Sequence, residues 1–310
     1  MASPDHHTVY LNAIGTAVPD HDIHDAFIGW ARARLPERER RLFDRMAARA
    51  AIGHRWSVLP EAAGSPVGDD GFYAGTTHPG TAARMTLYAE AAPALALEAI
   101  ARLDEQVALD DVTHLVVASC TGFVAPGIDQ IIARRLGLAA SIERTLIGFM
   151  GCYAAVAALR TARHIVRSTP TARVLVVTVE LSTLHLQAVD AIEPLLAMLQ
   201  FGDGAAAALV TSDPHGLALG QPFATTLAES DRLIRWDITD TGFAMHLSGE
   251  VPGRIATALA DPALAAQITG GQPADARSWT RSSTRSHSIP RHSPIRARCW
   301  STTATCRRRR

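Results

Sequence analysis

Residues 145–168 read TLIGFMGCYAAVAALRTARHIVRS and join an apolar approach, a glycine turn and an alanine-rich segment. We expect residues 145–151 to form a short apolar segment that leads into a turn, and residues 152–168 to form a helix. Two other continuous apolar runs, HLVVAS at 114–119 and RVLVVTV at 173–179, are typical of strands buried on both faces of a sheet. Strands that alternate with helices in this way predict a layered α/β fold.

The same alternation continues on both sides of this stretch. Further strands are predicted at residues 9–17 and 205–211, and a turn at 122–127. Helices are predicted at residues 23–53, 82–103 and 128–137, and Pro93 is expected to kink or divide the second of them. Residues 62–81, rich in Gly, Asp, Thr and Pro, predict a long loop.

Composition excludes several classes of protein. The chain has 310 residues, 47% of them hydrophobic and 19% charged, which is enough to bury a sizeable core. No apolar run approaches the roughly 18 residues of a membrane span, and the first residues lack the layout of a signal peptide. Four cysteines without a CxxC pair argue against a disulfide framework and for the cytoplasm, and no histidine or cysteine spacing suits a metal.

The net charge of zero hides two unlike parts. Residues 280–310 contain nine of the 30 basic residues and no acidic residue, whereas residues 1–279 contain all 30 acidic residues. Every basic residue is an arginine. The last 31 residues also lack any hydrophobic periodicity, so the sequence predicts a folded acidic body followed by an unrelated basic tail.

Cys152 is the strongest candidate for chemistry. It lies between a glycine turn and the predicted helix, where the helix dipole and free N–H groups favour a thiolate. N–H groups of the same turn would also stabilise an oxyanion formed on a thioester carbonyl. The local pattern fits equally well a small cysteine buried in the core, so both interpretations stay open at this point.

Three motifs in order, SCTG at 119–122, GFMGCYAA at 148–155 and FGDGAA at 201–206, resemble the type III polyketide synthases of the chalcone synthase superfamily. The resemblance covers about residues 8–279 and is closest to bacterial members. It implies a thiolase-like fold, a layered αβαβα core built from two similar halves, and a homodimer. The implied domains are 1–215, the half with the nucleophile; 216–279, the start of an incomplete second half; and 280–310, the aberrant tail.

The resemblance also implies a reaction and its residues. Cys152 falls on the nucleophile that takes an acyl group from an acyl-CoA, before malonyl-CoA is decarboxylated and condensed to give a pyrone or phenolic product. Phe201 and Met245 fall on the gatekeeper positions of the cavity, and Cys120 falls on a position that lines it. The substrates are CoA thioesters, with no separate cofactor, metal, nucleic acid or membrane. The starter unit, the number of extensions and the mode of ring closure are not encoded in these motifs.

Arg45 and Arg49, four residues apart on one predicted helix, fall on the family positions that contact CoA phosphates. The arginine fork matches phosphate oxygens, which suits this role. The alternative is a solvated charged face near Asp44. His164, His185 and His215 match no catalytic position and are interpreted as structural or surface residues. Gly202-Asp203-Gly204 is expected to shape a turn.

Two motifs of the family are missing. Neither the histidine of Trp-x-x-His-Pro-Gly-Gly nor the asparagine of Gly-Asn-Met-Ser-Ser is present, although Ser278-Trp279 resembles the start of the first. The codons of Thr302 to Arg308, read one base earlier, permit Asp-Tyr-Gly-Asn-Met-Ser-Ser. We therefore hypothesise that the tail is a shifted reading frame. Resequencing the gene tests this, and a single frame with no hidden motif would refute it.

Three alternatives remain at the level of sequence. The chain is a 3-oxoacyl-carrier-protein synthase III, which shares the Gly-Asp-Gly motif; or it is a catalytically impaired product that lacks the histidine and asparagine partners; or its tail is a basic segment that binds nucleic acid. The Gly-Cys-Tyr-Ala-Ala context disfavours the first, and the absence of an aromatic platform disfavours the last.

Overall fold

The fold was analysed in a computed structural model of the chain, which describes residues 8–59, 67, 71–74 and 78–268. The chain divides into two compact units, residues 1–251 and 252–310. Within the described residues the second unit contains the helix Pro262–Ile268 (α8) and all but the first residue of Val251–Leu259 (α7). The predicted tail at 280–310 lies outside the described residues.

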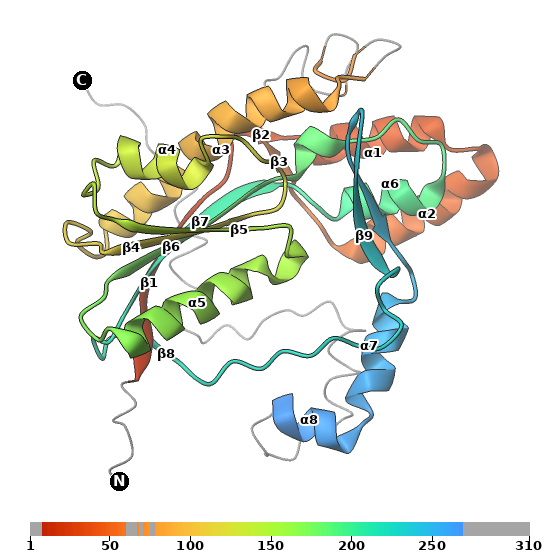
Figure 1. The fold of residues 1–310 in the computed structure, drawn as a ribbon. Coiled ribbons are helices and arrows are strands. Elements are labelled where there is room, and N and C mark those ends of the chain that lie inside the picture. Colours follow the sequence, from red (N-terminus) through yellow and green to blue (C-terminus); the bar gives the residue numbers. More distant parts are fainter. Residues whose placement is uncertain (1–7, 60–66, 68–70, 75–77, 269–310) are drawn as a thin grey trace, which may run out of the picture. The chain divides into compact units, whose positions relative to one another are not determined.

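The first unit contains strands and helices in alternation (Figure 1). The strands are β1 (Val9–Ala17), β2 (His21–Asp22), β3 (Trp56–Ser57), β4 (His114–Ser119), β5 (Glu143–Gly148), β6 (Val174–Leu181), β7 (Asp203–Thr211), β8 (Leu217–Leu219), β9 (Ile234–Thr239) and β10 (Gly242–Leu247). The α-helices are α1 (His24–Arg34), α2 (Glu37–Ala50), α3 (Thr81–Asp104), α4 (Ile128–Arg135), α5 (Ala154–Ser168) and α6 (Ile192–Leu199). Two short 3-10 helices are η1 (Gly151–Tyr153) and η2 (Ser182–His185).

Six strands form one mixed sheet in the order β5-β4-β6-β7-β1-β8. The strands β5, β4 and β6 are mutually parallel, and β7, β1 and β8 continue the sheet with antiparallel pairs. Parallel neighbours need a crossover, and α4 and α5 supply the crossovers around β5. The predicted α/β class is therefore confirmed.

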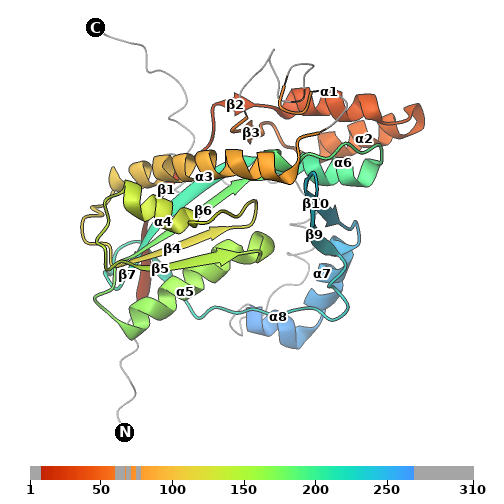
Figure 2. The same ribbon diagram turned by 45° about the horizontal axis from the view of Figure 1, so that its top comes forward.

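The sheet is covered on both faces, as Figures 1 and 2 show: α3 and α4 lie on one side and α5 on the other. Side chains of β4 and β6 alternate between the two cores. Leu115 and Val177 belong to the core on the α3 side, and Val116 and Val176 belong to the core on the α5 side. This alternation is the physical reason for the continuous apolar runs seen in the sequence, because both faces of each strand are buried.

The helix predicted at 23–53 is two helices. Leu35 is extended and Pro36 caps the start of α2, which agrees with the steric restriction that a proline places on the residue before it. In α3 the opposite holds, because Pro93 lies inside one helix that continues from Thr81 to Asp104. Pro93 is buried where α3 packs along β1 and β7, and this packing maintains the helix despite the lost hydrogen bond.

The Gly-Asp-Gly motif is not a turn. Asp203 is the first residue of β7, and its side chain is buried. The prediction was wrong because the local signal of two glycines indicates a break, whereas the long-range contacts of Asp203 start a strand there.

In the part of the chain that the structure describes, no helix combines the length and the apolar composition needed to span a bilayer.

Candidate active site

Cys152 lies in η1, directly before α5, and is exposed. The interpretation of a small buried core cysteine is therefore wrong. Ala154 and Ala158, by contrast, face the sheet and are buried. The helix thus packs through its small side chains, and Cys152 lies directly before its first turn, beside the N–H groups at the start of the helix.

The turn before Cys152 has an unusual backbone. Phe149 and Gly151 both have positive φ angles, 53° and 63°, with Met150 between them at φ −91° and ψ 2°. A left-handed conformation is ordinary for glycine and uncommon for phenylalanine. Non-glycine residues held in this region are concentrated at functional sites.

The N–H groups of this turn face a second cysteine. Cys120 follows β4, and its Sγ donates to the carbonyl oxygen of Gly151 at 3.7 Å. Burial raises the pKa of the Cys120 thiol, and the Glu180 carboxylate raises it further; the N–H groups of Met150, Gly151 and Phe149 offset part of this rise. Cys120 is therefore kept as a neutral thiol that contacts the turn before Cys152.

Glu180 joins the end of β6 to the end of β4. Its carboxylate accepts bonds from the N–H of Cys120 at 2.9 and 3.0 Å and from the Thr121 hydroxyl at 2.7 Å. Burial raises the pKa of Glu180, and the bonds from Thr121 and Cys120 lower it. Both partners belong to the segment that holds Cys120, and Cys120 contacts the turn before Cys152, so Glu180 holds the segment on which that turn rests.

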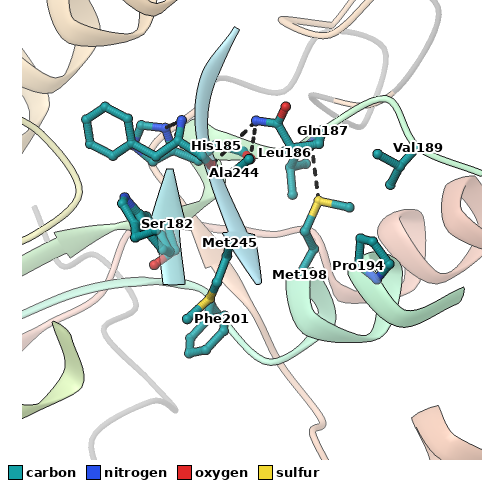
Figure 3. A pocket seen from close by; sticks show the side chains of 12 residues that line it. Ser182, His185, Leu186, Gln187, Val189, Pro194, Met198, Phe201, Ala244 and Met245 are labelled. Atoms are coloured by element: carbon teal, nitrogen blue, oxygen red, sulfur yellow. Dashed lines mark hydrogen bonds between the residues drawn. The ribbon is translucent and has the colours of Figure 1, made fainter. Parts of the chain in front are cut away.

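An apolar cavity of about 170 Å³ lies beside η2, α6 and the β9–β10 hairpin. Phe201 and Met245, the two predicted gatekeepers, both line it, and Figure 3 shows the Met245 side chain pointing at the Phe201 ring. The other lining residues are Ser182, His185, Leu186, Gln187, Val189, Pro194, Met198, Trp236, Phe243 and Ala244. Cys120 and Cys152 do not line this cavity.

His185 is a buried wall of the cavity with both ring nitrogens in use. Nε2 lies 2.7 Å from the carbonyl oxygen of Thr121, and Nδ1 lies 3.0 Å from the backbone N of Phe243. Since the carbonyl only accepts and the N–H only donates, the ring is neutral with its proton on Nε2. Burial lowers the pKa of His185 to about 4. The interpretation of His185 as structural is consistent with this.

Three phenylalanines connect the turn before Cys152 to the cavity. Phe149 in the turn and Phe123 after β4 each have ring centroids 6.0 Å from that of Phe243, and 6.3 Å from each other. Phe243 in turn stacks on His185 at 4.2 Å. The turn before Cys152 and the cavity wall thus share one aromatic cluster.

Arg45 and Arg49 lie on α2 with exposed side chains. The alternative, a solvated charged face near Asp44, agrees with this exposure, and Asp44 itself pairs with Nε of Arg32 at 3.2 Å. The helix α2 packs against α6, which contributes Pro194 to the cavity wall. The two arginines are thus on a helix adjoining the cavity, and their role with CoA stays a prediction.

Sequence reasoning missed several residues of this region. Glu180, Arg55 and Trp236 were not singled out, although Glu180 ends an otherwise apolar run, which is a usable signal for a buried charge. Arg55 and Trp236 gave no local signal, because their importance depends on elements far away in the sequence.

The mixed sheet, covered on both faces and carrying a cysteine at the start of α5, is the N-terminal half of a thiolase-like fold. The chain belongs to the chalcone and stilbene synthases, the type III polyketide synthases, since the family "Chalcone and stilbene synthases, N-terminal domain" matches residues 2–214. The predicted family is confirmed.

Individual relatives agree with this. Over 188 residues the chain is 35% identical to the alpha-pyrone synthesis polyketide synthase-like Pks18 of Mycobacterium tuberculosis. The aligned residues cover 57% of this chain and 47% of Pks18. The chain thus spans about half the length of the curated relatives it matches.

Two solved structures share the fold. The structure of PKS-I from the brown alga Ectocarpus siliculosus matches with a TM-score of 0.73 and 29% identity, over 83% of this chain and 72% of that one. The structure of 1,3,6,8-tetrahydroxynaphthalene synthase from Streptomyces coelicolor matches with a TM-score of 0.72 and 25% identity, over 83% of this chain and 73% of that one.

Proposed function

We propose that Cys152 is the acyl-accepting nucleophile of a type III polyketide synthase and that its first substrate is an acyl-CoA. The observation that carries the proposal is the exposed Cys152 at the start of α5, behind a left-handed turn that shares an aromatic cluster with an apolar cavity. The thiolate attacks the thioester carbonyl, CoA leaves as its thiolate, and the acyl group remains on sulfur as a new thioester.

The second proposed step is condensation. Malonyl-CoA loses CO₂, and the resulting enolate carbon attacks the acyl-enzyme carbonyl, which releases the Cys152 thiolate and forms a β-ketoacyl-CoA. Repetition and ring closure would give a pyrone or phenolic product. The relative named for α-pyrone synthesis supports this class of product. Arg45 and Arg49 would hold the CoA phosphates, and no further cofactor takes part.

The missing motifs favour a second candidate, a chain that is acylated without condensing. In the family the missing histidine and asparagine polarise and hold the malonyl carbonyl, and one such hydrogen-bond donor contributes about 10²–10³-fold to a rate, so their loss separates the two steps. On this proposal Cys152 still accepts an acyl group while malonyl-CoA decarboxylation is slow.

Acylation is the direct test. Incubation of the full chain with hexanoyl-CoA is expected to add one hexanoyl group, as measured by intact-protein mass spectrometry and assigned by peptide mapping to Cys152. Cys152→Ala should abolish the adduct, and Cys120→Ala, the matched control, should retain it. An adduct that persists in Cys152→Ala would contradict the proposal.

Malonyl-CoA separates the candidates in the same preparation, with no carrier protein present. A chain restored in its C-terminal motifs should consume malonyl-CoA at least roughly 10²–10³-fold faster than this chain, the factor that one such hydrogen-bond donor supplies. Equal rates would show that the missing motifs do not limit condensation. Consumption that requires a carrier protein would favour the 3-oxoacyl-carrier-protein synthase III alternative.

We further propose that a second copy of the chain pairs along β5. This strand is the edge of the six-stranded sheet and is largely exposed. Leu146, Phe149 and Met150 are 47%, 51% and 45% exposed, and an apolar edge of this kind is a template for pairing. Sedimentation is expected to show a dimer that Leu146→Arg converts to a monomer; a wild-type monomer at micromolar concentration would refute the pairing.

A further inference from the structure

A buried arginine holds the cavity wall from behind. Arg55 lies just before β3 and is 3% exposed. Its Nε donates to the carbonyl oxygen of Phe201 at 2.8 Å, and its Nη2 donates to that of Met198, also at 2.8 Å. Both of those residues line the cavity. One guanidinium therefore fixes the backbone of two wall residues at the end of α6.

The segment after Phe201 is docked on the same strand. A Cβ added to Gly202 would lie 3.2 Å from the carbonyl oxygen and 3.3 Å from the nitrogen of Trp56, which is tighter than an ordinary van der Waals contact, so the two backbones approach each other closely here. The Asp203 carboxylate accepts a bond from the N–H of Val58 at 2.9 Å. The motif read in sequence as a turn thus presses the residues around Phe201 against β3.

Arg55 retains its charge in this position. Burial lowers the pKa of Arg55 to about 10, while the carboxylates of Asp203 and Asp22 raise it. The guanidinium stays protonated at neutral pH, and hydrogen bonds from a charged donor are stronger than neutral ones. The ring of Phe27 packs against the guanidinium at 4.4 Å and blocks its withdrawal.

The Phe201 ring has no polar atom that could anchor it, and among the described residues it makes no contact with another aromatic ring. It faces the cavity next to Met245, a flexible side chain (Figure 3). The position of its ring therefore depends on its backbone, and the backbone is held by Arg55. We propose that Arg55 is a positioning residue that sets the place of Phe201 in the cavity wall and so the length of acyl chain accepted at Cys152; the second clause rests on the proposed function.

The first readout does not depend on activity. The full chain is prepared with 4-fluorophenylalanine at position 201, and separately at the core position Phe43, and observed by ¹⁹F NMR. Arg55→Met is expected to broaden or split the resonance at 201 and to leave that of 43 unchanged. The same change at both positions, or at neither, would overturn the proposal.

The second readout is the acyl-chain profile of Cys152 acylation. Arg55→Met should raise the half-saturating concentration of octanoyl-CoA about tenfold and leave that of acetyl-CoA unchanged, a factor in the range for one altered contact in an apolar pocket. Phe201→Ala should give the same profile, and the double variant should add nothing more, because the two residues act as a unit. Additive effects would refute the positioning role.

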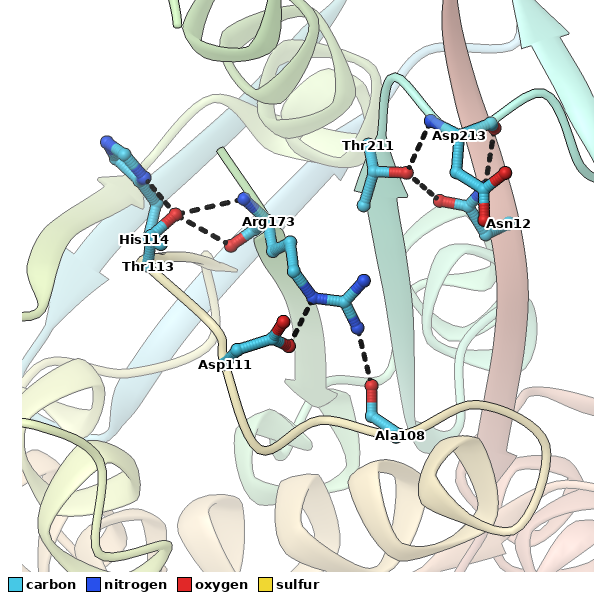
Figure 4. Close-up of polar contacts among 8 residues, drawn as sticks. All are labelled: Asn12, Ala108, Asp111, Thr113, His114, Arg173, Thr211 and Asp213. Atoms are coloured by element: carbon cyan, nitrogen blue, oxygen red, sulfur yellow. Dashed lines mark hydrogen bonds and ion pairs between the residues drawn. The ribbon is translucent and has the colours of Figure 1, made fainter. Parts of the chain in front are cut away.

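Arg173 supplies a matched control. It lies at the opposite end of β6 from the cavity segment, and its Nη2 donates to the carbonyl oxygen of Ala108 at 2.6 Å while its Nε pairs with Asp111 at 2.5 Å (Figure 4). Arg173→Met should leave both the resonance at 201 and the acyl-chain profile as they are in the unaltered chain. A changed acyl-chain profile in this control would mean that loss of an arginine elsewhere in the fold also alters the profile, and would refute the specific role of Arg55.

Two outcomes separate this proposal from the function on which it rests. If Arg55→Met does not fold, Arg55→Lys, which keeps the charge but not the fork, replaces it and should give intermediate shifts in both readouts. If the unaltered chain is not acylated at all, the proposed function is wrong, and the fluorine resonance alone decides whether Arg55 positions Phe201.

Discussion

Arg84→Met is expected to lower the free energy of unfolding by about 4 kcal/mol, because buried carbonyls that lose their donor cost about 1–3 kcal/mol each. Arg84 is fully buried. It donates from Nε to the carbonyl oxygen of Pro79 at 2.9 Å, and from Nη1 to those of Leu184 at 2.8 Å and Leu186 at 3.1 Å. Methionine fills similar space and restores none of these bonds.

The loss should also loosen the β9–β10 hairpin. A Cβ on Gly242, the first residue of β10, would lie 2.8 Å from Cδ of Arg84, so the hairpin rests directly on this side chain. Urea unfolding measures the change. Arg102→Met on the same helix is the control: Arg102 pairs with Glu105 on the surface, and such a pair is worth at most about 1 kcal/mol. Equal losses in the two variants would contradict the account of Arg84.

His185→Gln is expected to be less stable than the wild type at pH 7, and this difference in the free energy of unfolding is expected to shrink as the pH falls. The folded pKa of His185 is about 4, and its ordinary value is 6.5. Between these values the unfolded chain binds a proton that the folded chain refuses, so the histidine destabilises the folded state as the pH falls, by about 3 kcal/mol in total at 1.36 kcal/mol per unit. Glutamine, which keeps one donor and one acceptor, does not titrate.

The comparison must be made between variants because Asp203 acts in the opposite direction. Burial raises the pKa of Asp203 from 3.8 to about 6, so its contribution to stability is present at low pH and is lost as the pH rises through about 6. The two effects offset each other in the unaltered chain. Urea unfolding of both proteins at several pH values between 7 and 4.5 should therefore show the gap between His185→Gln and wild type closing on acidification. A gap independent of pH would show that the folded and unfolded chains bind the His185 proton equally, and would contradict the lowered pKa.

The local patterns of the sequence were sufficient for much of the sheet. Residues 9–17 form β1 as predicted, and the runs at 114–119 and 173–179 form β4 and β6 to within two residues. The strands β4 and β6 were predictable because burial on both faces demands apolar side chains, whereas β1, which is only partly buried, was predictable from its alternating pattern. The place of Cys152 before α5 was predictable for a related reason, since glycines and alanines mark the turn and the helix directly.

Signals that compete with tertiary packing were less reliable. Pro36 separates the first helix from the second, whereas α3 continues through Pro93 without a break. The two differ in their surroundings: α3 is held along its length by the sheet, whereas α1 and α2 meet at Pro36 on the surface. A proline alone therefore does not decide whether a helix continues.

By itself the sequence determined the α/β class, the family through its motifs, and the cysteine at the start of a helix. Only the tertiary structure decided that Phe201 and Met245 line one cavity, that Cys120 contacts the turn before Cys152, and that Arg55 and Glu180 are buried. The physical reason is that strand and helix patterns depend on near neighbours. The state of a buried charge or a cavity wall depends instead on partners brought together from distant segments by the sheet.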